Sequence, residues 1–380
     1  MPRARTEARR GAQLLLRALR APCELPTLPR EDWELLLRVA RRTRLLGRIE
    51  SDLAQAGLLE HIPAQAANHL RAARNVVVHR QTLVAWEVNR VQWALQALDV
   101  PLVILKGAAY VLAGLPAARG RLFADLDLLV PLAQIEAVEQ ALVAHGWLRM
   151  QIDPYDDRYY RVWMHEIPPL RHRERKTEID LHHAILPRTS RLKPDPALLL
   201  AAARPLDDPR LRVLAPPDMV LHSLVHLFLE GDPVEGLRLR DLVDACDLLD
   251  HFGQEPGFWE SLVPRARELD LQRPLYYGLR FARSILGADI PAAATSGAEH
   301  GAPTAPVRWL MDWLVPLAML PEHPDYPRRS AAVARWLLYA RSHWLRMPPL
   351  MLVRHLGYKA WLRLRGVRKG VDLTQLDLKQ

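Results

Sequence analysis

Cysteine and long apolar runs are scarce in this sequence, and each shortage excludes a class of protein. The 380 residues contain two cysteines, Cys23 and Cys246, which lie far apart and match neither a disulfide framework nor the spacing of a metal site. The apolar run near the arginine-rich N-terminus, Leu14 to Leu16, is too short for a signal peptide. No window approaches the roughly 18–20 uninterrupted apolar residues of a membrane span. We therefore expect a cytoplasmic protein in a reducing compartment.

The composition is that of a globular protein with a basic balance. Hydrophobic residues make up 49% and charged residues 25% of the chain, which is enough apolar content for a sizeable core. The length allows one large domain or two to three ordinary ones. The net charge of +9 favours polyanionic partners such as nucleotides, nucleic acid or an anionic membrane face. A composition rich in arginine, alanine and leucine is also typical of a GC-rich genome, so charge alone does not choose a partner.

Helical periodicity on both sides of a mixed central stretch predicts an α+β fold that is mostly helical overall. The small residues 291–306, rich in Pro and Gly, predict a flexible loop or hinge, and the Pro- and Arg-rich residues 187–215 predict a connector around a short helix, Ala197 to Ala203. The chain divides into an N-terminal helical region (1–98), an α/β core with a small mixed β-sheet (99–188), a second helical region (189–290) and a basic, tryptophan-rich helical region (291–380).

The central region alternates between strand and helix patterns. Pro131 starts its second helix and Gly146 ends it, as first-turn prolines and terminal glycines do. A polar turn, Arg171 to Lys176, separates the two strands of a hairpin at its end. The expected elements are strand 102–105, helix 107–114, strand 123–130, helix 132–145, strand 147–152, and hairpin strands 159–167 and 177–185.

Two aspartates alternate with leucines in the second expected strand. Residues two apart in extended backbone point to the same side, so Asp125 and Asp127 project together while Leu126 and Leu128 face the other way. Neighbouring carboxylates repel each other and are costly to desolvate, so a fold keeps them beside a cation or in water. Hard oxygen ligands favour Mg²⁺, with Mn²⁺ as the alternative. The pattern therefore predicts a divalent-metal site.

A third carboxylate stands in the last expected strand. There Glu178, Asp180 and His182 share one face, while Ile179 and Leu181 share the other. Asp180 is the candidate third metal ligand, and Glu178 is the alternative to it. His182 either contacts a substrate or is a satisfied polar residue beside a buried strand.

Basic residues and a glycine precede the acidic strand. Lys106-Gly107 follows the first strand, where a glycine lets the backbone and a helix N-terminus approach phosphates. Lys106 either contacts a phosphate or is a solvated strand end. Arg121, four residues before Asp125, either binds a phosphate through two parallel hydrogen bonds or neutralises the carboxylates. Nucleotidyl transfer needs such a set, because divalent metal ions hold both the triphosphate and the attacking oxygen.

On these motifs the central region resembles the DNA polymerase beta-type nucleotidyltransferase superfamily, and within it an uncharacterised bacterial nucleotidyltransferase-like family. The specific match covers about 100–186, and the helical flanks match only in general character. The family's elements Leu-Lys-Gly, Arg, Asp-Ile-Asp-Leu-Leu-Val and Ile/Val-Asp-Leu-His stand here as 105–107, Arg121, 125–130 and 179–182.

The resemblance implies Asp125 and Asp127 as metal ligands, Asp180 as the third carboxylate and Gly107 in the phosphate loop. The chain departs from the superfamily's pattern at Gly107-Ala108, where Gly-Ser or Gly-Gly is usual, so a side-chain hydroxyl on the phosphate is missing. The spacing from Gly107 to Asp125 is also longer than in compact members. These departures bear on turnover more than on the fold.

Two patterns in the second helical region have a structural and a functional interpretation. His222-x-x-x-His226 puts two histidines on one helix face, but it lacks the Glu of a His-Glu-x-x-His zinc site and an evident third ligand, which favours a structural role. Arg238, Arg240 and Asp241 open a helix that either closes over a nucleotide or is a plain salt-bridged helix start.

The C-terminal region interleaves tryptophans with basic residues. Such a mixture binds RNA or an anionic membrane surface. The favoured alternative is an amphipathic helix that packs its tryptophans into the core and leaves its arginines wet. The residues concerned are Trp336, Trp344 and Trp361, with Arg335, Arg341, Arg346, Arg354, Lys359, Arg363, Arg365, Arg368 and Lys369.

The resulting hypothesis is a Mg²⁺-dependent nucleotidyltransferase that moves a nucleoside monophosphate from an NTP to an acceptor hydroxyl and releases pyrophosphate. The acceptor class (RNA, protein or small molecule) stays open, because a fold does not decide it. One alternative is a nucleotide- or RNA-binding module without turnover, which the Gly107-Ala108 loop favours. The other is a glycosyltransferase that uses Asp-x-Asp to hold a sugar nucleotide. That enzyme needs a longer α/β half before the motif, where residues 1–98 are predicted to be helical.

Overall fold

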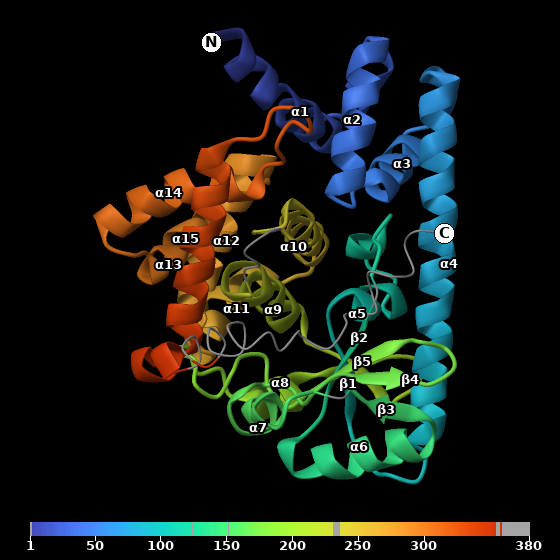
Figure 1. Ribbon diagram of the computed structural model, residues 1–380, viewed down its shortest axis with the longest axis vertical. Helices are drawn as coiled ribbons and strands as arrows, with labels where there is room; N and C mark the ends of the chain where they lie inside the picture. The colour runs from blue at the N-terminus through green and yellow to red at the C-terminus, as the bar shows by residue number, and fades with distance from the viewer. Residues whose placement is uncertain (1, 124, 151, 231–235, 355–357, 359–380) are drawn as a thin grey trace.

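The computed structural model describes residues 2–123, 125–150, 152–230, 236–354 and 358. Its elements form a mostly helical α+β fold around one mixed sheet, which confirms the predicted fold class. The sheet lies at one end of the molecule, and the helical regions extend away from it (Figure 1).

Helices precede the sheet, as the pattern in 1–98 predicts. α2 carries Glu31 and Asp32 in its first turn, where negative charge complements the helix dipole. α4 is the long helix that runs from the other N-terminal helices down beside the sheet (Figure 1). The elements of this region are α1 (Pro2–Arg20), η1 (Pro22–Thr27), α2 (Arg30–Arg42), α3 (Leu46–Gln55), η2 (Leu59–His61) and α4 (Ala64–Ala94).

The strands form a single seven-stranded sheet in the order β3-β4-β5-β2-β1-β7-β6. The pairs β2–β5 and β1–β7 are parallel, and the other neighbours are antiparallel. The parallel β2–β5 pair lies at the centre and carries the acidic motif. The strands are β1 (Leu102–Ile104), β2 (Asp125–Leu129), β3 (Trp147–Arg149), β4 (Leu170–His172), β5 (Glu178–His182), β6 (Arg204–Pro205) and β7 (Leu211–Val213).

Helices cover both faces of the sheet. α6 (Ile135–Ala144), after the turn η4 (Leu132–Gln134), packs on β3 and β5 and lies beneath the sheet in Figure 1. α5 (Lys106–Leu112) contacts β2 and α9 (Pro216–Leu229) above it. Because both faces are covered, every residue of β1 is buried and apolar, as is usual for central strands of a covered sheet.

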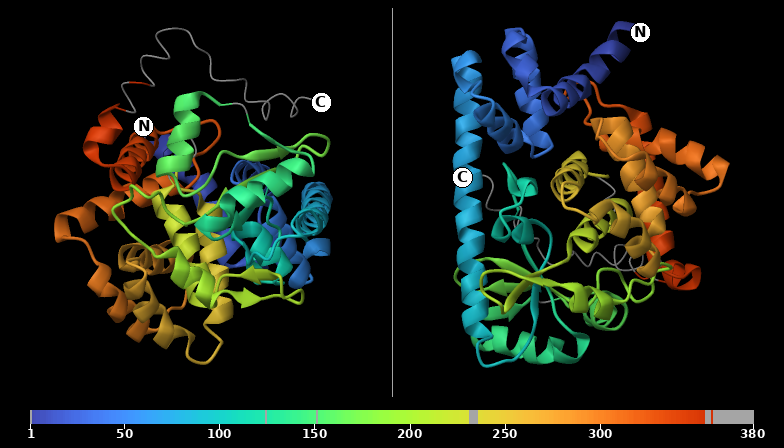
Figure 2. Two further views of the ribbon diagram at one scale, coloured as in Figure 1. Left: turned by 90° about the horizontal axis from the view of Figure 1, so that it is seen from below. Right: turned by 180° about the vertical axis from the view of Figure 1, so that it is seen from behind.

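The remaining helices form a layer that packs against α9. α9 and α10 lie side by side and join the sheet to this layer (Figure 2). The turn η3 (Pro116–Ala118) before β2 packs against α10. The elements are α8 (Pro196–Ala202), α9, α10 (Leu239–Phe252), α11 (Phe258–Glu268), α12 (Gln272–Phe281), the π-helical η5 (Ala282–Leu286), α13 (Ala292–Ala298), η6 (Glu299–Gly301), α14 (Ala305–Met319) and α15 (Arg329–Arg346).

The expected strand 159–167 is wrong, because most of it belongs to the helix α7 (Pro154–Trp163). The Asp153 side chain caps this helix by accepting a hydrogen bond from the backbone N–H of Tyr155, and Pro154 occupies the first turn. These capping signals outweigh the strand propensity of the aromatic residues. Of the expected strand, only Glu166 pairs with β5, through an isolated bridge to His182.

Two connector predictions are also corrected. Residues 187–215 contain the expected short helix as α8, but they also supply β6 and β7, and β7 pairs in parallel with β1. This pairing buries Leu211 and Val213. The prolines around them obscure the strand pattern in the sequence. Residues 291–306, expected to form a flexible loop, contain α13, whose alanines Ala294 and Ala298 pack into the core.

One continuous apolar core joins the sheet to the helices in the described part of the chain. Within the same residues, none of the helices combines the length and the apolar character that crossing a membrane requires. The acidic motif therefore lies where the sheet, α5 and α9 meet, at the boundary between the α/β region and the helical layer.

Candidate active site

The three predicted aspartates lie on two neighbouring parallel strands. In the β2–β5 pair, Asp127 is the register partner of Asp180, and Asp125 is the partner of Glu178. Because side chains alternate along a strand, all four carboxylates project from one face of the sheet. Asp125 is exposed, Asp180 is half-buried and Asp127 is buried. The structure therefore places the three aspartates side by side, from the exposed Asp125 to the buried Asp127.

Asp127 is held by two basic side chains. Its Oδ1 accepts a hydrogen bond from Lys106 Nζ at 2.8 Å and lies 3.0 Å from His182 Nε2. Burial alone raises the pKa of Asp127, but the Lys106 ammonium and the His182 ring outweigh it and hold the pKa below its usual range. Burial lowers the pKa of His182, whereas its contacts with Asp127 and Glu166 raise it overall. The side chain of His182 is thus a partner of the acidic motif.

The pKa of Asp180 is shifted in the direction opposite to that of Asp127. Burial, and then the negative charges of Asp127 and Glu166, raise its pKa well above the ordinary aspartate value. This repulsion means that the face holds more carboxylate than the basic groups in contact with it offset. A divalent cation would relieve it, and the hard carboxylate oxygens suit Mg²⁺ or Mn²⁺. Among the described residues, the three aspartates are not a group whose donor atoms all lie within 4.8 Å of one another, so the metal ion that their pattern predicts stays a prediction.

Lys106 stands at the junction of β1 and α5 with an unusual backbone conformation. Its φ of +49° lies in the left-handed region, which non-glycine residues enter rarely and at a cost. The conformation turns the chain from β1 into α5 and brings the ammonium group to Asp127. Lys106 is therefore not a solvated strand end, because its side chain is largely buried in an ion pair.

Arg121 is not a partner of the Asp-x-Asp pair in the described contacts. Its Nε donates to Asp244 Oδ2 of α10 at 2.6 Å, and its guanidinium lies 5.5 Å from the centroid of the Tyr110 ring. It packs against Gly107, where a Cβ atom would come within 2.3 Å of Arg121 Nη1. Arg121 thus joins the loop before β2 to the helical layer and supports the residue after Lys106.

Sequence reasoning missed residues on two segments that close over this face. His165 and Glu166 lie beside the end of β5 because the backbones pair there. The His183 N–H donates to the His165 carbonyl at 2.8 Å. Glu166 Oε2 lies 3.5 Å from His182 Nδ1. From α9, Glu230 Oε1 lies 3.7 Å from His165 Nε2. The wrong strand prediction for 159–167 concealed the first two residues.

The two histidines of α9 continue the same polar centre. His226 Nε2 lies 3.1 Å from Glu230 Oε2, and His226 Nδ1 lies 3.5 Å from Asp241 Oδ2. Burial, and then the positive charge of Lys106, lower the pKa of the buried His222 to about 3. The i, i+4, i+8 spacing of His222, His226 and Glu230 explains why one helix face reaches the site. Sequence reasoning did not consider Glu230, which stands four residues beyond His226.

The start of α10 is the salt-bridged helix start that the sequence favours. Arg240 and Asp241 form an ion pair at 3.1 Å at the start of α10, as a salt-bridged helix start requires.

The favoured core packing of the C-terminal tryptophans is wrong for Trp336 and Trp344, which are 60% and 47% exposed. Helix α15 instead buries alanine and leucine against α14 and α9. Trp361 lies outside the described residues, as do Lys359, Arg363, Arg365, Arg368 and Lys369.

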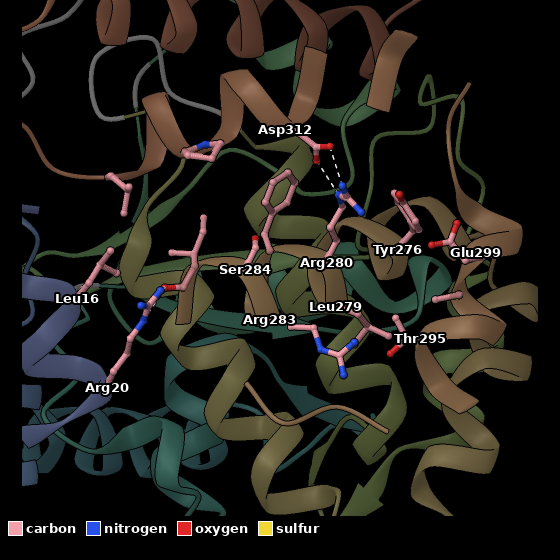
Figure 3. A pocket seen from close by; sticks show the side chains of 15 residues that line it. Leu16, Arg20, Tyr276, Leu279, Arg280, Arg283, Ser284, Thr295, Glu299 and Asp312 are labelled. Carbon is pink, nitrogen blue, oxygen red and sulfur yellow. Dashed lines mark hydrogen bonds and ion pairs between the residues drawn. The ribbon is translucent and has the colours of Figure 1, made fainter. Parts of the chain in front are cut away.

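A separate cavity of about 570 Å³ lies between the end of α1 and α12–α14 (Figure 3). Its arginines are engaged by the protein. Arg20 donates to the Ile285 carbonyl at 3.1 Å, and Arg280 pairs with Asp312 at 2.6 Å. None of the predicted site residues lines this cavity. The acidic face of β2 and β5 therefore remains the candidate active site.

The chain combines helical regions with a mixed sheet that carries carboxylates on two paired strands. The sequence model of the family described as uncharacterised nucleotidyltransferase matches residues 29–287. The chain belongs to this family, as its motifs predict. The match includes the whole sheet and the helices from α2 to α12.

Among solved structures, the chain is similar to the crystal structure of JHP933 from Helicobacter pylori. The two share 14% sequence identity with a TM-score of 0.31, and the alignment covers 76% of this chain and 97% of that chain. No curated protein matches the sequence.

Proposed function

We propose that the protein transfers a nucleoside monophosphate from an NTP to an acceptor hydroxyl, with Mg²⁺ or Mn²⁺ at the acidic face of β2 and β5. The observation that carries the proposal is the register of the parallel pair, in which Asp127 stands beside Asp180 and Asp125 follows on the same face. Membership of a nucleotidyltransferase family supports a nucleotide substrate.

In this reaction the acceptor oxygen forms a bond to the α-phosphorus of the NTP. The bond between that phosphorus and the α–β bridging oxygen breaks, pyrophosphate leaves with the electron pair, and the hydroxyl proton passes to solvent. A divalent ion, when bound, supplies positive charge to the phosphates and to the attacking oxygen. Asp125, Asp127 and Asp180 would hold it.

Other residues of the chain position this set. Lys106 and His182 fix the Asp127 carboxylate from two sides, and a fixed donor set loses little freedom when substrate binds. Lys106, held beside Asp127 at the same face, would also supply positive charge to a phosphate bound there. We assign Arg121 a supporting role, because contact with a phosphate would require it to leave Asp244.

The decisive experiment incubates the protein with each α-labelled NTP, Mg²⁺ or Mn²⁺, and cell extract. Pyrophosphate release together with label in RNA, protein or a small molecule is the expected result, and the labelled fraction identifies the acceptor class. Asp180→Asn should abolish transfer, whereas Glu178→Gln, the register partner of Asp125 on the same face, should retain it. Transfer that survives in Asp180→Asn contradicts the assignment.

One observation favours a second candidate, a nucleotide-binding module without turnover. Asp127 Oδ1 is engaged by both Lys106 and His182 within the protein, and Ala108 provides no hydroxyl after Gly107. NTP binding measured by calorimetry, without pyrophosphate release for any NTP or either metal ion, would establish this candidate in place of the enzyme.

A further inference from the structure

The polar centre contains a second group of donor atoms, composed of nitrogen as well as oxygen. One ring nitrogen each of His165 and His182 and a carboxylate oxygen of Glu166 all lie within 4.8 Å of one another. We propose that these three residues bind a divalent transition-metal ion such as Zn²⁺, at a site separate from the aspartates of β2 and β5.

The distances between donor atoms are close to those around a bound ion. His182 Nδ1 lies 3.5 Å and His165 Nε2 lies 3.9 Å from Glu166 Oε2. Donors in a tetrahedral zinc site, with bonds of about 2.0–2.2 Å, lie about 3.3–3.5 Å apart. Glu166 Oε2 is therefore within about half an ångström of the required separation from each ring nitrogen. Glu230 Oε1, 3.7 Å from His165 Nε2, offers a further oxygen from α9.

Burial and hydrogen bonding leave the histidine nitrogens available for an ion. The His165 and His182 residues are 4% and 1% exposed, and the Nδ1 atom of each ring has no hydrogen-bond partner among the described residues. Buried polar atoms without a partner are rare, and each needs an explanation such as a bound ion. A ligand at His182 Nδ1 would satisfy one of them.

Asp127 provides the orientation that a metal-binding histidine usually has. His182 Nε2 lies 3.0 Å from Asp127 Oδ1, so a neutral His182 with its proton on Nε2 donates to Asp127 and directs the Nδ1 lone pair toward Glu166. Carboxylates in this second position fix the tautomer and the ring of metal-bound histidines. The backbone bridge between Glu166 and His182 holds the two ligands in register.

The donor set selects the class of ion. Imidazole nitrogens suit Zn²⁺ and other late first-row ions, whereas Mg²⁺ prefers oxygen alone. Three protein ligands leave a fourth position for water or for a group of the substrate. The site stands whether or not the protein transfers nucleotides, and an ion there would hold His182 against Asp127.

The test measures metal content and ligation without nucleotide, so its result is independent of the proposed transfer reaction. Purified full-length protein, stripped with a chelator, is titrated with Zn²⁺ in the presence of millimolar Mg²⁺. We expect one equivalent that Mg²⁺ does not displace. X-ray absorption of that equivalent should show imidazole ligation. Absence of a tight equivalent, or a spectrum with oxygen ligands alone, overturns the proposal.

Variants locate the bound ion. His165→Gln and Glu166→Gln should each weaken Zn²⁺ binding at least tenfold, while His183→Gln, a buried histidine next in sequence to His182, should bind as the parent does. Retention of the full affinity in His165→Gln and Glu166→Gln, or equal loss in His183→Gln, overturns the proposal. Circular dichroism checks that each variant is folded. Should a variant fail to fold, the absorption spectrum of the parent protein decides.

Discussion

The Arg121 guanidinium occupies the space into which a side chain at Gly107 would project. An ideal Cβ at position 107 would lie 2.3 Å from Arg121 Nη1 and 3.0 Å from Phe123 Cδ1. Arg121 cannot retreat easily, because it is buried and bonded to Asp244. Packing inside the protein therefore requires a glycine here, in addition to any role of Gly107 in approaching phosphates.

We expect Gly107→Ala to destabilise the protein by about 1–3 kcal/mol, the usual cost of overpacking a buried site. Urea unfolding measures the change. In an Arg121→Met background the same substitution should cost less, because the guanidinium that it meets is absent. Equal penalties in the two backgrounds would show that Arg121 is not the obstacle.

The two aspartates of the β2 motif should differ in their effect on stability. Asp127→Ala removes the buried partner of Lys106 and His182 and should cost about 3–5 kcal/mol, because it leaves buried groups without their counter-charge. Asp125→Ala, at an exposed position, should change the free energy of unfolding by about 0.5 kcal/mol or less. Urea unfolding of both variants tests this contrast. Nucleotidyl transfer should be lost in both, and a similar stability loss in both variants would contradict the observed burial.

Helices α3 and α10 are joined by a buried ion pair that should couple them energetically. Arg48 Nη2 donates to Asp247 Oδ1 at 2.9 Å, and both side chains are largely buried. A double-mutant cycle with Arg48→Met and Asp247→Asn should give a clearly resolved coupling energy, since losing one partner leaves a buried charge.

The exposed Arg38–Asp325 pair, joined at 2.8 Å, is the matched control for that cycle. Solvent screens such pairs, so its coupling should be too small to resolve by denaturation. A coupling at Arg48–Asp247 no larger than at Arg38–Asp325 would show that the α3–α10 contact does not depend on this bridge.

Stability should fall in acid partly because of Glu139 on α6. Burial raises the pKa of this carboxyl, but hydrogen bonds from Arg161 and Arg149 outweigh it and lower the pKa overall. A carboxylate with a lowered pKa in the folded state stabilises the fold above its unfolded pKa, and the stabilisation is lost as the pH falls through the folded pKa.

The variant Glu139→Gln isolates this contribution. Its urea midpoint should lie below that of the parent at pH 7, and the difference should shrink as the pH is lowered below about 4, the ordinary glutamate range. A difference that stays constant from pH 7 to pH 3 would mean that the charge of Glu139 does not contribute.

Local pattern alone predicted the helical regions, the strand that carries Asp125 and Asp127, and the face that these two residues share. This was possible because the spacing of apolar residues differs between strands and helices. The family motif added the nucleotide chemistry, since it compares short segments rather than contacts. Where local signals competed, as in the aromatic stretch 159–167, the helix cap at Asp153 prevailed over strand propensity.

Only the tertiary structure decided which charges meet. Arg121 precedes Asp125 by four residues, yet its partner is Asp244, 123 positions away. Glu166 contacts His182, and Glu230, from another segment, contacts His165. Exposure of Trp336 depends likewise on which face of α15 packs on α14. Sequence spacing determines which side of its own element a residue occupies, but the packing between elements selects its partner. His165, Glu166 and Glu230 are therefore the part of this site that the sequence alone could not predict.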